Sequence, residues 1–232
     1  MARPTTRATP PIRRATSSLE PFTAGRLEPG ADHDAVAFID LDLSGQDASD
    51  SSFLECRLER CAVDGLMLRR ARIAETAIVD IHGVSLDLAD STWRDVELSG
   101  GRLGALLLAG ATMSSVRVRR AKLGFVSVTG GTLDDILFEA CEIGSLDARI
   151  AQLRSVRFID CTVGELDVTG ATLAKVDLSG ARLRSLIGVE SLRGAILGHG
   201  QLLDLAPLLA AELGIEVRPD PSDGGAETPS EV

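Results

Sequence analysis

The side chains that could perform chemistry are scattered in this sequence. The histidines, His33, His82 and His199, have neither a nucleophile nor a metal-ligand pattern near them. The lysines, Lys122 and Lys175, do not end a phosphate-binding loop. We therefore expect a protein that is not an enzyme and that has no catalytic residues, cofactor-binding residues or metal ligands.

The four cysteines could bind a metal or react with an oxidant, but their spacing indicates a packing role. No CxxC pair and no Cys–His ligand spacing occurs. All four fall at one position of the repeat described below, which other repeats fill with small residues. We predict free, buried thiols, with a disulfide between Cys141 and Cys161 as the alternative. The cysteines are Cys56, Cys61, Cys141 and Cys161.

The charge balance limits the kinds of partner. The chain has 24 Lys and Arg residues against 34 Asp and Glu residues, a formal net charge of -10, with no Tyr and one Trp. Direct binding of nucleic acid needs a basic surface and usually exposed aromatic side chains. We therefore expect a protein partner, without direct contact to nucleic acid or a membrane.

A five-residue period organises the chain. In Gly164–Leu183, GELDVTGATLAKVDLSGARL, one phrase occurs four times, and residues 36–190 keep the same register for 155/5 = 31 pentads. This period fits neither a helix nor an uninterrupted strand, but it fits a short strand followed by a corner. All nine prolines lie outside residues 30–206, as continuous backbone ladders require. The sequence therefore predicts a β-solenoid.

A second period gives the number of sides in a coil. The residue two positions before the central apolar residue alternates between small and large side chains, which favours four-sided coils of 20 residues. Residues ten apart then face each other across the interior, and large residues face small ones there. These pairs are Phe38 with Ala48, Trp93 with Gly83, and Phe138 with Ala148.

At residues 171–173, 176–180 and 181–183 the phrase resembles that of the pentapeptide-repeat family: a small residue, Asp or Asn, Leu and two polar residues. The resemblance covers residues 36 to about 190. It implies an all-β fold, a right-handed quadrilateral β-helix, and 31/4 pentads give about eight coils. A C-terminal α-helical cap is expected to cover its end.

The chain divides into four predicted parts. Residues 1–30 form a disordered basic N-terminal arm, and residues 31–190 form the pentapeptide-repeat β-solenoid. Residues 191–218 form a C-terminal capping and dimerisation helix region, and residues 219–232 form a disordered acidic tail. No apolar run follows the first arginines, as a secretion signal would require, so we expect a cytoplasmic protein.

The predicted cap lies in residues 201–213, QLLDLAPLLAAEL. Pro207 inside this run favours two short helices or a kink. The fluoroquinolone-resistance members of the resembled family end in a comparable apolar helix that forms their dimer contact, which implies a homodimer here. The candidate dimer-contact residues, at helical spacing, are Leu202, Leu205, Leu209 and Leu213.

Charged residues 20 apart should stack on neighbouring coils. Most such columns pair opposite signs, which indicates cross-coil ion pairs. Glu55, Glu75 and Asp95 share one column and Asp147 and Asp167 another, so these five form the candidate acidic docking strip. The predicted opposite-sign pairs are Arg60–Asp80, Glu97–Arg117, Arg119–Glu139, Lys122–Glu142, Asp134–Arg154 and Arg157–Asp177.

Two functions agree with these features. The first is a non-enzymatic, rigid protein-interaction scaffold whose partner the sequence does not identify. The second is implied by the resemblance to the resistance members: a DNA mimic that binds and modulates the type II topoisomerases DNA gyrase or topoisomerase IV. Such a mimic would act through charge and shape.

Overall fold

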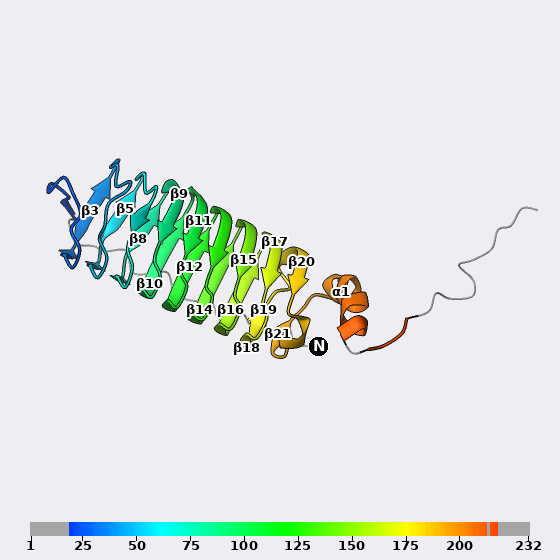
Figure 1. Ribbon diagram of the computed structural model, residues 1–232. Helices are drawn as coiled ribbons and strands as arrows, with labels where there is room; N and C mark the ends of the chain where they lie inside the picture. The colour runs from blue at the N-terminus through cyan, green and yellow to red at the C-terminus, as the bar shows by residue number, and fades with distance from the viewer. Residues whose placement is uncertain (1–18, 213, 218–232) are drawn as a thin grey trace, which may run out of the picture.

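The computed structural model describes residues 19–212 and 214–217. Within them, parallel strands stack into a rod with α-helix α1 (His199–Glu212) at its C-terminal end (Figure 1). Partners on neighbouring strands differ by 20 residues, as in Thr92 opposite Thr112 and Thr112 opposite Thr132. The predicted 20-residue coil is therefore confirmed.

The strands form one sheet of 14 strands and one of 7. The larger sheet contains β1 (Glu20–Pro21), β2 (Asp32–Asp34), β3 (Val36–Ile39), β4 (Ser52–Leu54), β5 (Arg57–Glu59), β7 (Arg72–Ala74), β8 (Ala77–Val79), β10 (Thr92–Ser99), β12 (Thr112–Arg119), β14 (Thr132–Glu139), β16 (Gln152–Ile159), β18 (Thr172–Ala174), β19 (Val176–Asp177) and β21 (Ala195–Ile196). The smaller sheet contains β6 (Leu66–Met67), β9 (His82–Asp87), β11 (Arg102–Leu107), β13 (Lys122–Ser127), β15 (Glu142–Asp147), β17 (Cys161–Asp167) and β20 (Ala181–Ile187).

The corners of the coil lie at every fifth residue. In β10 the chain bends at Asp95, whose φ of 54° is in the left-handed region, so one strand of the larger sheet covers two faces of the rod. Other corner residues, including Glu55 and Glu75, take the same conformation at φ of 53° and 51°. This conformation is unfavourable for residues other than glycine, and the ladder hydrogen bonds on both sides offset its cost.

The interior of the rod is one continuous apolar core that extends from Leu27 to Leu205. The central residues of the repeat are buried, with Phe38 and Trp93 at 0% and 1% exposed. The four cysteines are also buried and free, which confirms the predicted thiols. The two apolar residues of each pentad therefore point inward, because they lie two positions apart on a strand.

The rod begins earlier than the sequence predicts. β1 pairs with β3, and Leu27 is 5% exposed with its N–H donating to Gln46 Oε1 at 2.8 Å. Residues 19–30 thus belong to the first coil and not to an arm, while residues 1–18 lie outside the described part. The pentad register misses this coil because Glu20 aligns with Val36, only 16 residues away.

The rod also ends later than predicted. β21 pairs with β19, so the ladder continues past residue 190. The order β1-β3-β5-β8-β10-β12-β14-β16-β19-β21 gives about nine turns instead of about eight. After β21, α1 runs as one helix through Pro207 and not as two short helices. Leu213 and residues 219–232 lie outside the described residues.

The stacking of the coils requires a small residue at Gly83. A Cβ atom at Gly83 would lie 2.9 Å from the Asp64 backbone nitrogen and 3.1 Å from the Val63 carbonyl carbon. Both atoms belong to the preceding coil. Coil stacking therefore limits the volume at Gly83 before any side chain across the interior is considered.

Candidate functional site

Three of the candidate acidic residues stack at the corner that bends the larger sheet. The Glu55 N–H donates to Ala74 O at 3.1 Å, and the Glu75 N–H donates to Arg94 O at 3.0 Å. These bonds connect successive coils, which are about 4.8 Å apart. Glu55, Glu75 and Asp95, called the corner strip below, therefore occupy fixed backbone positions in one row.

Two members of the corner strip, Glu75 and Asp95, have little compensating charge among the described residues. Asp95 has a side chain that is 48% exposed, and its Oδ2 lies 3.9 Å from Arg94 Nε. Glu75 is exposed and has no ion pair within residues 19–212 and 214–217. Glu75 and Asp95 thus present carboxylates to solvent from fixed backbone positions.

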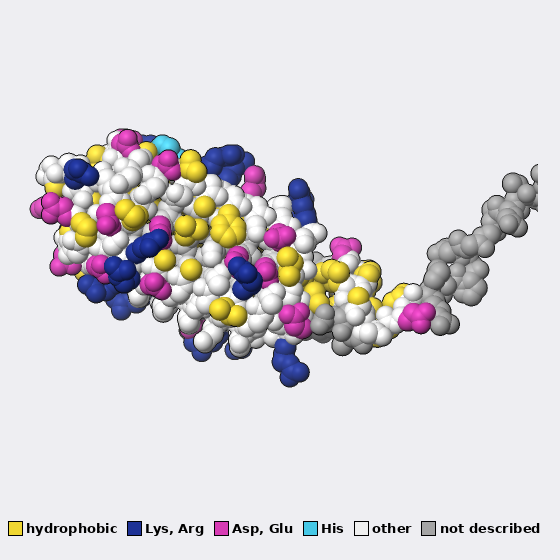
Figure 2. All heavy atoms as spheres, in the orientation of Figure 1, with side chains coloured by type: hydrophobic (Ala, Val, Ile, Leu, Met, Phe, Trp, Pro, Cys, Tyr) yellow, Lys and Arg dark blue, Asp and Glu magenta, His cyan; other side chains and the backbone are white. Residues whose placement is uncertain are grey.

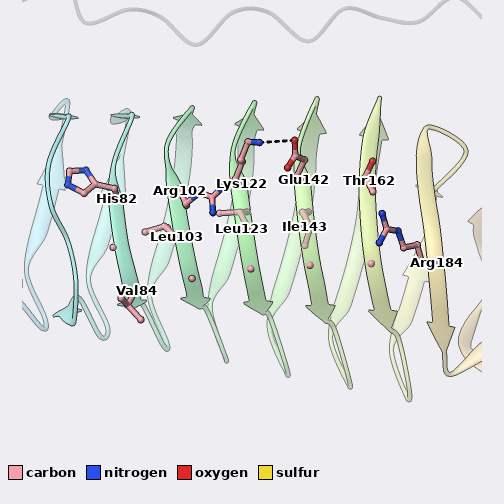
Figure 3. A pocket seen from close by; sticks show the side chains of 15 residues that line it. His82, Val84, Arg102, Leu103, Lys122, Leu123, Glu142, Ile143, Thr162 and Arg184 are labelled. Carbon is pink, nitrogen blue, oxygen red and sulfur yellow. Dashed lines mark ion pairs between the residues drawn. The ribbon is translucent and has the colours of Figure 1, made fainter.

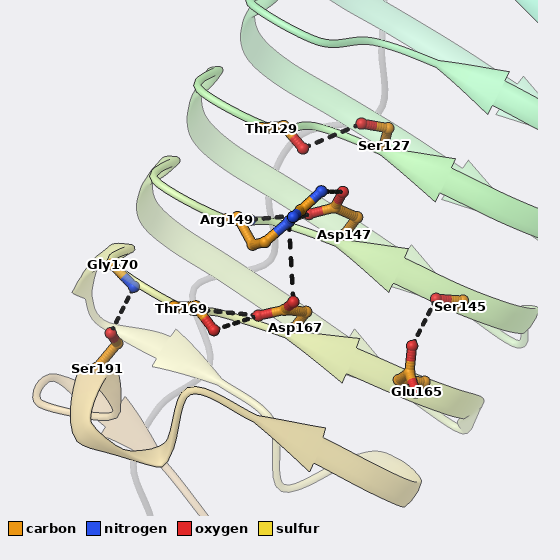
Figure 4. Close-up of polar contacts among 10 residues, drawn as sticks. All are labelled: Ser127, Thr129, Ser145, Asp147, Arg149, Glu165, Asp167, Thr169, Gly170 and Ser191. Atoms are coloured by element: carbon orange, nitrogen blue, oxygen red, sulfur yellow. Dashed lines mark hydrogen bonds and ion pairs between the residues drawn. The ribbon is translucent and has the colours of Figure 1, made fainter.

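Asp147 and Asp167 serve the fold instead (Figure 4). Their side chains are 13% and 21% exposed, and both approach Arg149, with closest contacts of 2.7 and 3.8 Å. Asp167 Oδ1 also accepts hydrogen bonds from the backbone N–H and Oγ1 of Thr169 at 2.9 and 2.6 Å. The hydrogen bond from Arg149 lowers the pKa of Asp147. These two residues cap their own turns and lie apart from the corner strip.

The surface elsewhere mixes charges of both signs (Figure 2). Arg60 pairs with Asp40 on the preceding coil, at 2.6 Å, instead of with Asp80. This hydrogen bond lowers the pKa of Asp40. Three predicted pairs form, namely Arg119–Glu139 at 2.9 Å, Lys122–Glu142 at 3.0 Å and Asp134–Arg154 at 2.9 Å.

A groove of about 830 Å³ follows the smaller sheet, and a row of glycines lines it (Figure 3). A Cβ atom at Gly144 would lie 2.3 Å from the carbonyl oxygen of Gly124, and the others are similarly restricted. Close stacking of the coils therefore requires these glycines. The sequence prediction did not include the groove, although its signal is a glycine every 20 residues. The glycines are Gly104, Gly124, Gly144 and Gly164.

The cap helix has an inner and an outer face. Leu205 is 8% exposed and Leu209 packs on the core, so these two predicted contact residues cover the last coil. Gln201 Nε2 fastens the helix by donating to Leu178 O at 2.8 Å and to a second backbone carbonyl. Leu202 remains exposed at 48%. The prediction did not include Leu203 and Leu208, which are exposed at 61% and 48%, because the direction of each helix face depends on how the helix packs.

Residues 19–212 and 214–217 contain no group of three or more His, Cys, Asp or Glu side chains that could hold a metal. Burial raises the pKa of Cys56 to about 11 and lowers that of His33. In the same part of the chain, no helix has the length and apolar character needed to cross a membrane.

Stacked 20-residue coils with a five-residue register define a parallel β-solenoid. The family model described as pentapeptide repeats, with 8 copies, matches residues 151–185. This match confirms the resemblance inferred from the sequence. No curated protein sequence matches the chain.

Two solved structures illustrate the likeness. HetL, a pentapeptide repeat protein involved in heterocyst differentiation regulation from the cyanobacterium Nostoc, is 21% identical, with 76% of this chain and 94% of HetL covered and a TM-score of 0.37. Full-length QnrB1, a plasmid-mediated fluoroquinolone resistance protein, is 21% identical, with 84% and 95% covered and a TM-score of 0.33. Because both identities and both TM-scores are low, the assignment of the fold rests on the ladder register described above.

Proposed function

We propose that this protein is a non-enzymatic interaction scaffold that binds a partner protein through the corner strip. The observation that carries the proposal is the row of Glu55, Glu75 and Asp95 at corners of three successive coils, in which the Glu55 and Glu75 N–H groups donate to the next coil. Because the backbone is already fixed, binding there costs little conformational entropy. The partner is expected to present basic groups about 4.8 Å apart or at multiples of that spacing.

A charge reversal tests this role. The variant Glu55→Lys/Glu75→Lys/Asp95→Lys should lose its partner and keep its fold, because these side chains lie outside the core. Affinity capture from cytoplasmic extract with quantitative mass spectrometry, followed by binding of the purified candidate, measures the loss. We expect affinity to fall by at least about tenfold, since like charges would replace complementary ones.

The matched control is Asp90→Lys/Asp160→Lys/Glu165→Lys, which changes the net charge equally at exposed positions away from the corner strip. This control should retain the partner. If both variants lose it equally, net charge and not the corner strip determines binding. If neither loses it, binding occurs on another face.

The alternative function is a DNA mimic that binds DNA gyrase or topoisomerase IV. It is favoured by the net charge of -10 together with the exposed apolar surface of the cap helix. The same proteins separate the two functions in a gyrase supercoiling assay. A mimic should inhibit at micromolar concentration, less well in salt because charge attraction is screened, and only the corner-strip variant should lose inhibition. Absence of inhibition would leave the scaffold function.

The outer face of the cap helix should join two chains into a homodimer about a two-fold axis. Leu203 and Leu208 are exposed and apolar, and the inner face already covers the core. We expect Leu203→Glu/Leu208→Glu to halve the mass measured by light scattering and to leave the thermal melting temperature of the rod nearly unchanged.

Val84→Glu/Ile159→Glu is the control, because it places the same charges at exposed apolar positions on the rod, 70% and 41% exposed. This control should keep the dimer mass. A monomeric wild-type protein at all concentrations would contradict the homodimer and leave α1 as a cap alone.

A further inference from the structure

The groove on the smaller sheet is positively charged, although the protein as a whole is acidic. Its lining includes Arg102, Lys122 and Arg184 but only one acidic residue, Glu142, whereas the chain carries a net charge of -10. Lys122 Nζ lies 3.0 Å from Glu142 Oε1, so these two charges compensate each other. Arg102 and Arg184 are exposed and form no ion pair with the described residues. The groove therefore holds two uncompensated positive charges.

The shape of the groove is that of a straight trough along the rod. The four glycines of its floor are at least partly exposed, and Val84 and Arg184 stand at its two ends (Figure 3). The backbone of the floor is already used by the ladder, as where the Glu142 N–H donates to Ala121 O at 3.0 Å. An occupant thus cannot add a strand here. It gains from charge and from close contact with the glycines.

The dimensions of the trough fit a short extended peptide. From Val84 to Arg184 there are five coil steps, or about 24 Å at about 4.8 Å each, which about seven extended residues fill. Arg102 lies four steps, or about 19 Å, from Arg184 along the rod, and six extended residues advance about 20 Å. Residues separated by an even number point to the same side of an extended chain. Two acidic side chains six residues apart therefore match the two arginines.

We propose that the groove binds an extended acidic segment of a partner protein, with one carboxylate on Arg102 and a second, six residues away, on Arg184. Arginine binds a carboxylate through two parallel hydrogen bonds, which fixes the direction of the segment as well as adding affinity. Small side chains between the two carboxylates lie over the glycines. This goes beyond the proposed function, because it adds a second docking surface whose charge is opposite to that of the corner strip.

The charges near the groove favour a peptide over a nucleic acid. A nucleic acid carries a negative charge at every nucleotide and needs several cations along its path. Here only two cations are uncompensated, and Glu142 in the groove and the exposed Glu165 beside it repel further negative charge. A short acidic segment places its charge only where the groove is positive.

Calorimetric titration of the full-length protein with a synthetic peptide tests the proposal. The probe is a seven-residue peptide, blocked at both ends, with glutamate at its first and last positions and alanine and serine between them. A second peptide has the same composition but two adjacent central glutamates. We expect a Kd below about 1 mM for the first peptide and at least about threefold weaker binding of the second. Binding of the first should weaken in about 1 M salt, where charge is screened within about 3 Å.

Variants with exposed substitutions locate the binding. Arg102→Gln/Arg184→Gln should lower the affinity at least about fivefold with an unchanged circular dichroism spectrum. Glu142→Gln should raise it about twofold or more, because Lys122 is then uncompensated.

The matched control is Arg72→Gln/Arg94→Gln, which removes two exposed arginines from β7 and β10 of the larger sheet. This control should bind the first peptide as the wild type does. Equal losses in the two double variants would assign binding to net charge and overturn the proposal. Equal affinities of the two peptides, no binding at about 1 mM peptide, or tighter binding of a seven-nucleotide oligothymidylate would also overturn it.

The corner-strip variant Glu55→Lys/Glu75→Lys/Asp95→Lys separates this inference from the proposed function. It should bind the peptide at least as tightly as the wild type, because the groove is unchanged. Loss of the peptide in this variant would place binding outside the groove and contradict the inference. If no partner depends on the corner strip, the proposed function fails, while the peptide titration still decides whether the groove is a docking surface.

Discussion

Replacing Trp93 by alanine is expected to destabilise the rod by about 3–5 kcal/mol, because it removes the largest buried side chain and leaves a cavity. Trp93 is 1% exposed. Its Nε1–H donates to Ser91 Oγ at 2.9 Å, and Ser91 Oγ donates to Leu88 O at 2.6 Å. The substitution therefore removes both packing and a buried hydrogen bond. Urea unfolding followed by circular dichroism measures the change.

Two other substitutions provide stability losses with which that of Trp93→Ala can be compared. Trp93→Phe keeps an aromatic ring, and Ser91 still donates to Leu88, so the loss should be clearly smaller. Phe125→Ala removes a ring that is 36% exposed, and we expect a loss of about 1–2 kcal/mol, since part of that ring stays in water after folding. Equal losses for Trp93→Ala and Phe125→Ala would contradict the assignment of Trp93 to the core.

Gly83→Leu is the second substitution with a large expected effect. We expect it to lower the free energy of unfolding by about 3 kcal/mol, near the upper end for substitutions that overpack a core. The added Cβ would meet backbone atoms of Asp64 and Val63 at 2.9–3.1 Å, and backbone in a stacked coil moves only if the ladder is distorted. Gly83→Ala should already lower the free energy of unfolding, because the conflict begins at Cβ. Gly200→Leu is the control, since nothing lies within 4 Å of a Cβ atom there.

A double substitution separates two reasons for the small residue at this position. If Gly83 only made room for the ring opposite, Trp93→Leu would rescue Gly83→Leu. Because the nearest atoms belong to the preceding coil, we expect no rescue, and the two losses should add. A stability of the double variant above that of Gly83→Leu alone would favour compensation across the interior.

The candidate site was only partly predictable for a physical reason. Residues 20 apart stack, so Glu55, Glu75 and Asp95 could be placed in one row from the sequence. The sequence does not show which carboxylates the fold itself uses. By sequence, Asp147 and Asp167 were equivalent to the residues of this row. In the structure, Arg149 pairs with Asp147, and the Thr169 N–H donates to Asp167.

The two ends of the rod were also only partly predictable from the sequence. Glu20–Pro21 aligns with Val36–Ala37, and the Glu20 N–H donates to Ala35 O. Backbone hydrogen bonding of this kind leaves no five-residue signal in the sequence. The surface that Leu203 and Leu208 expose depends on the docking of α1 against the last coil. Periodicity alone cannot give the direction of that helix, since any face rich in leucine could point inward.

The sequence by itself determined the parallel solenoid, its 20-residue coil, its inward residues and its free cysteines, because each follows from local periodicity repeated over 31 pentads. Only the tertiary structure decided where the ladder starts and stops, why Gly83 is small, and which carboxylates remain available at the corner. These depend on contacts between one coil and the next and on competition among neighbouring charges. Such contacts exist only once the coils are stacked.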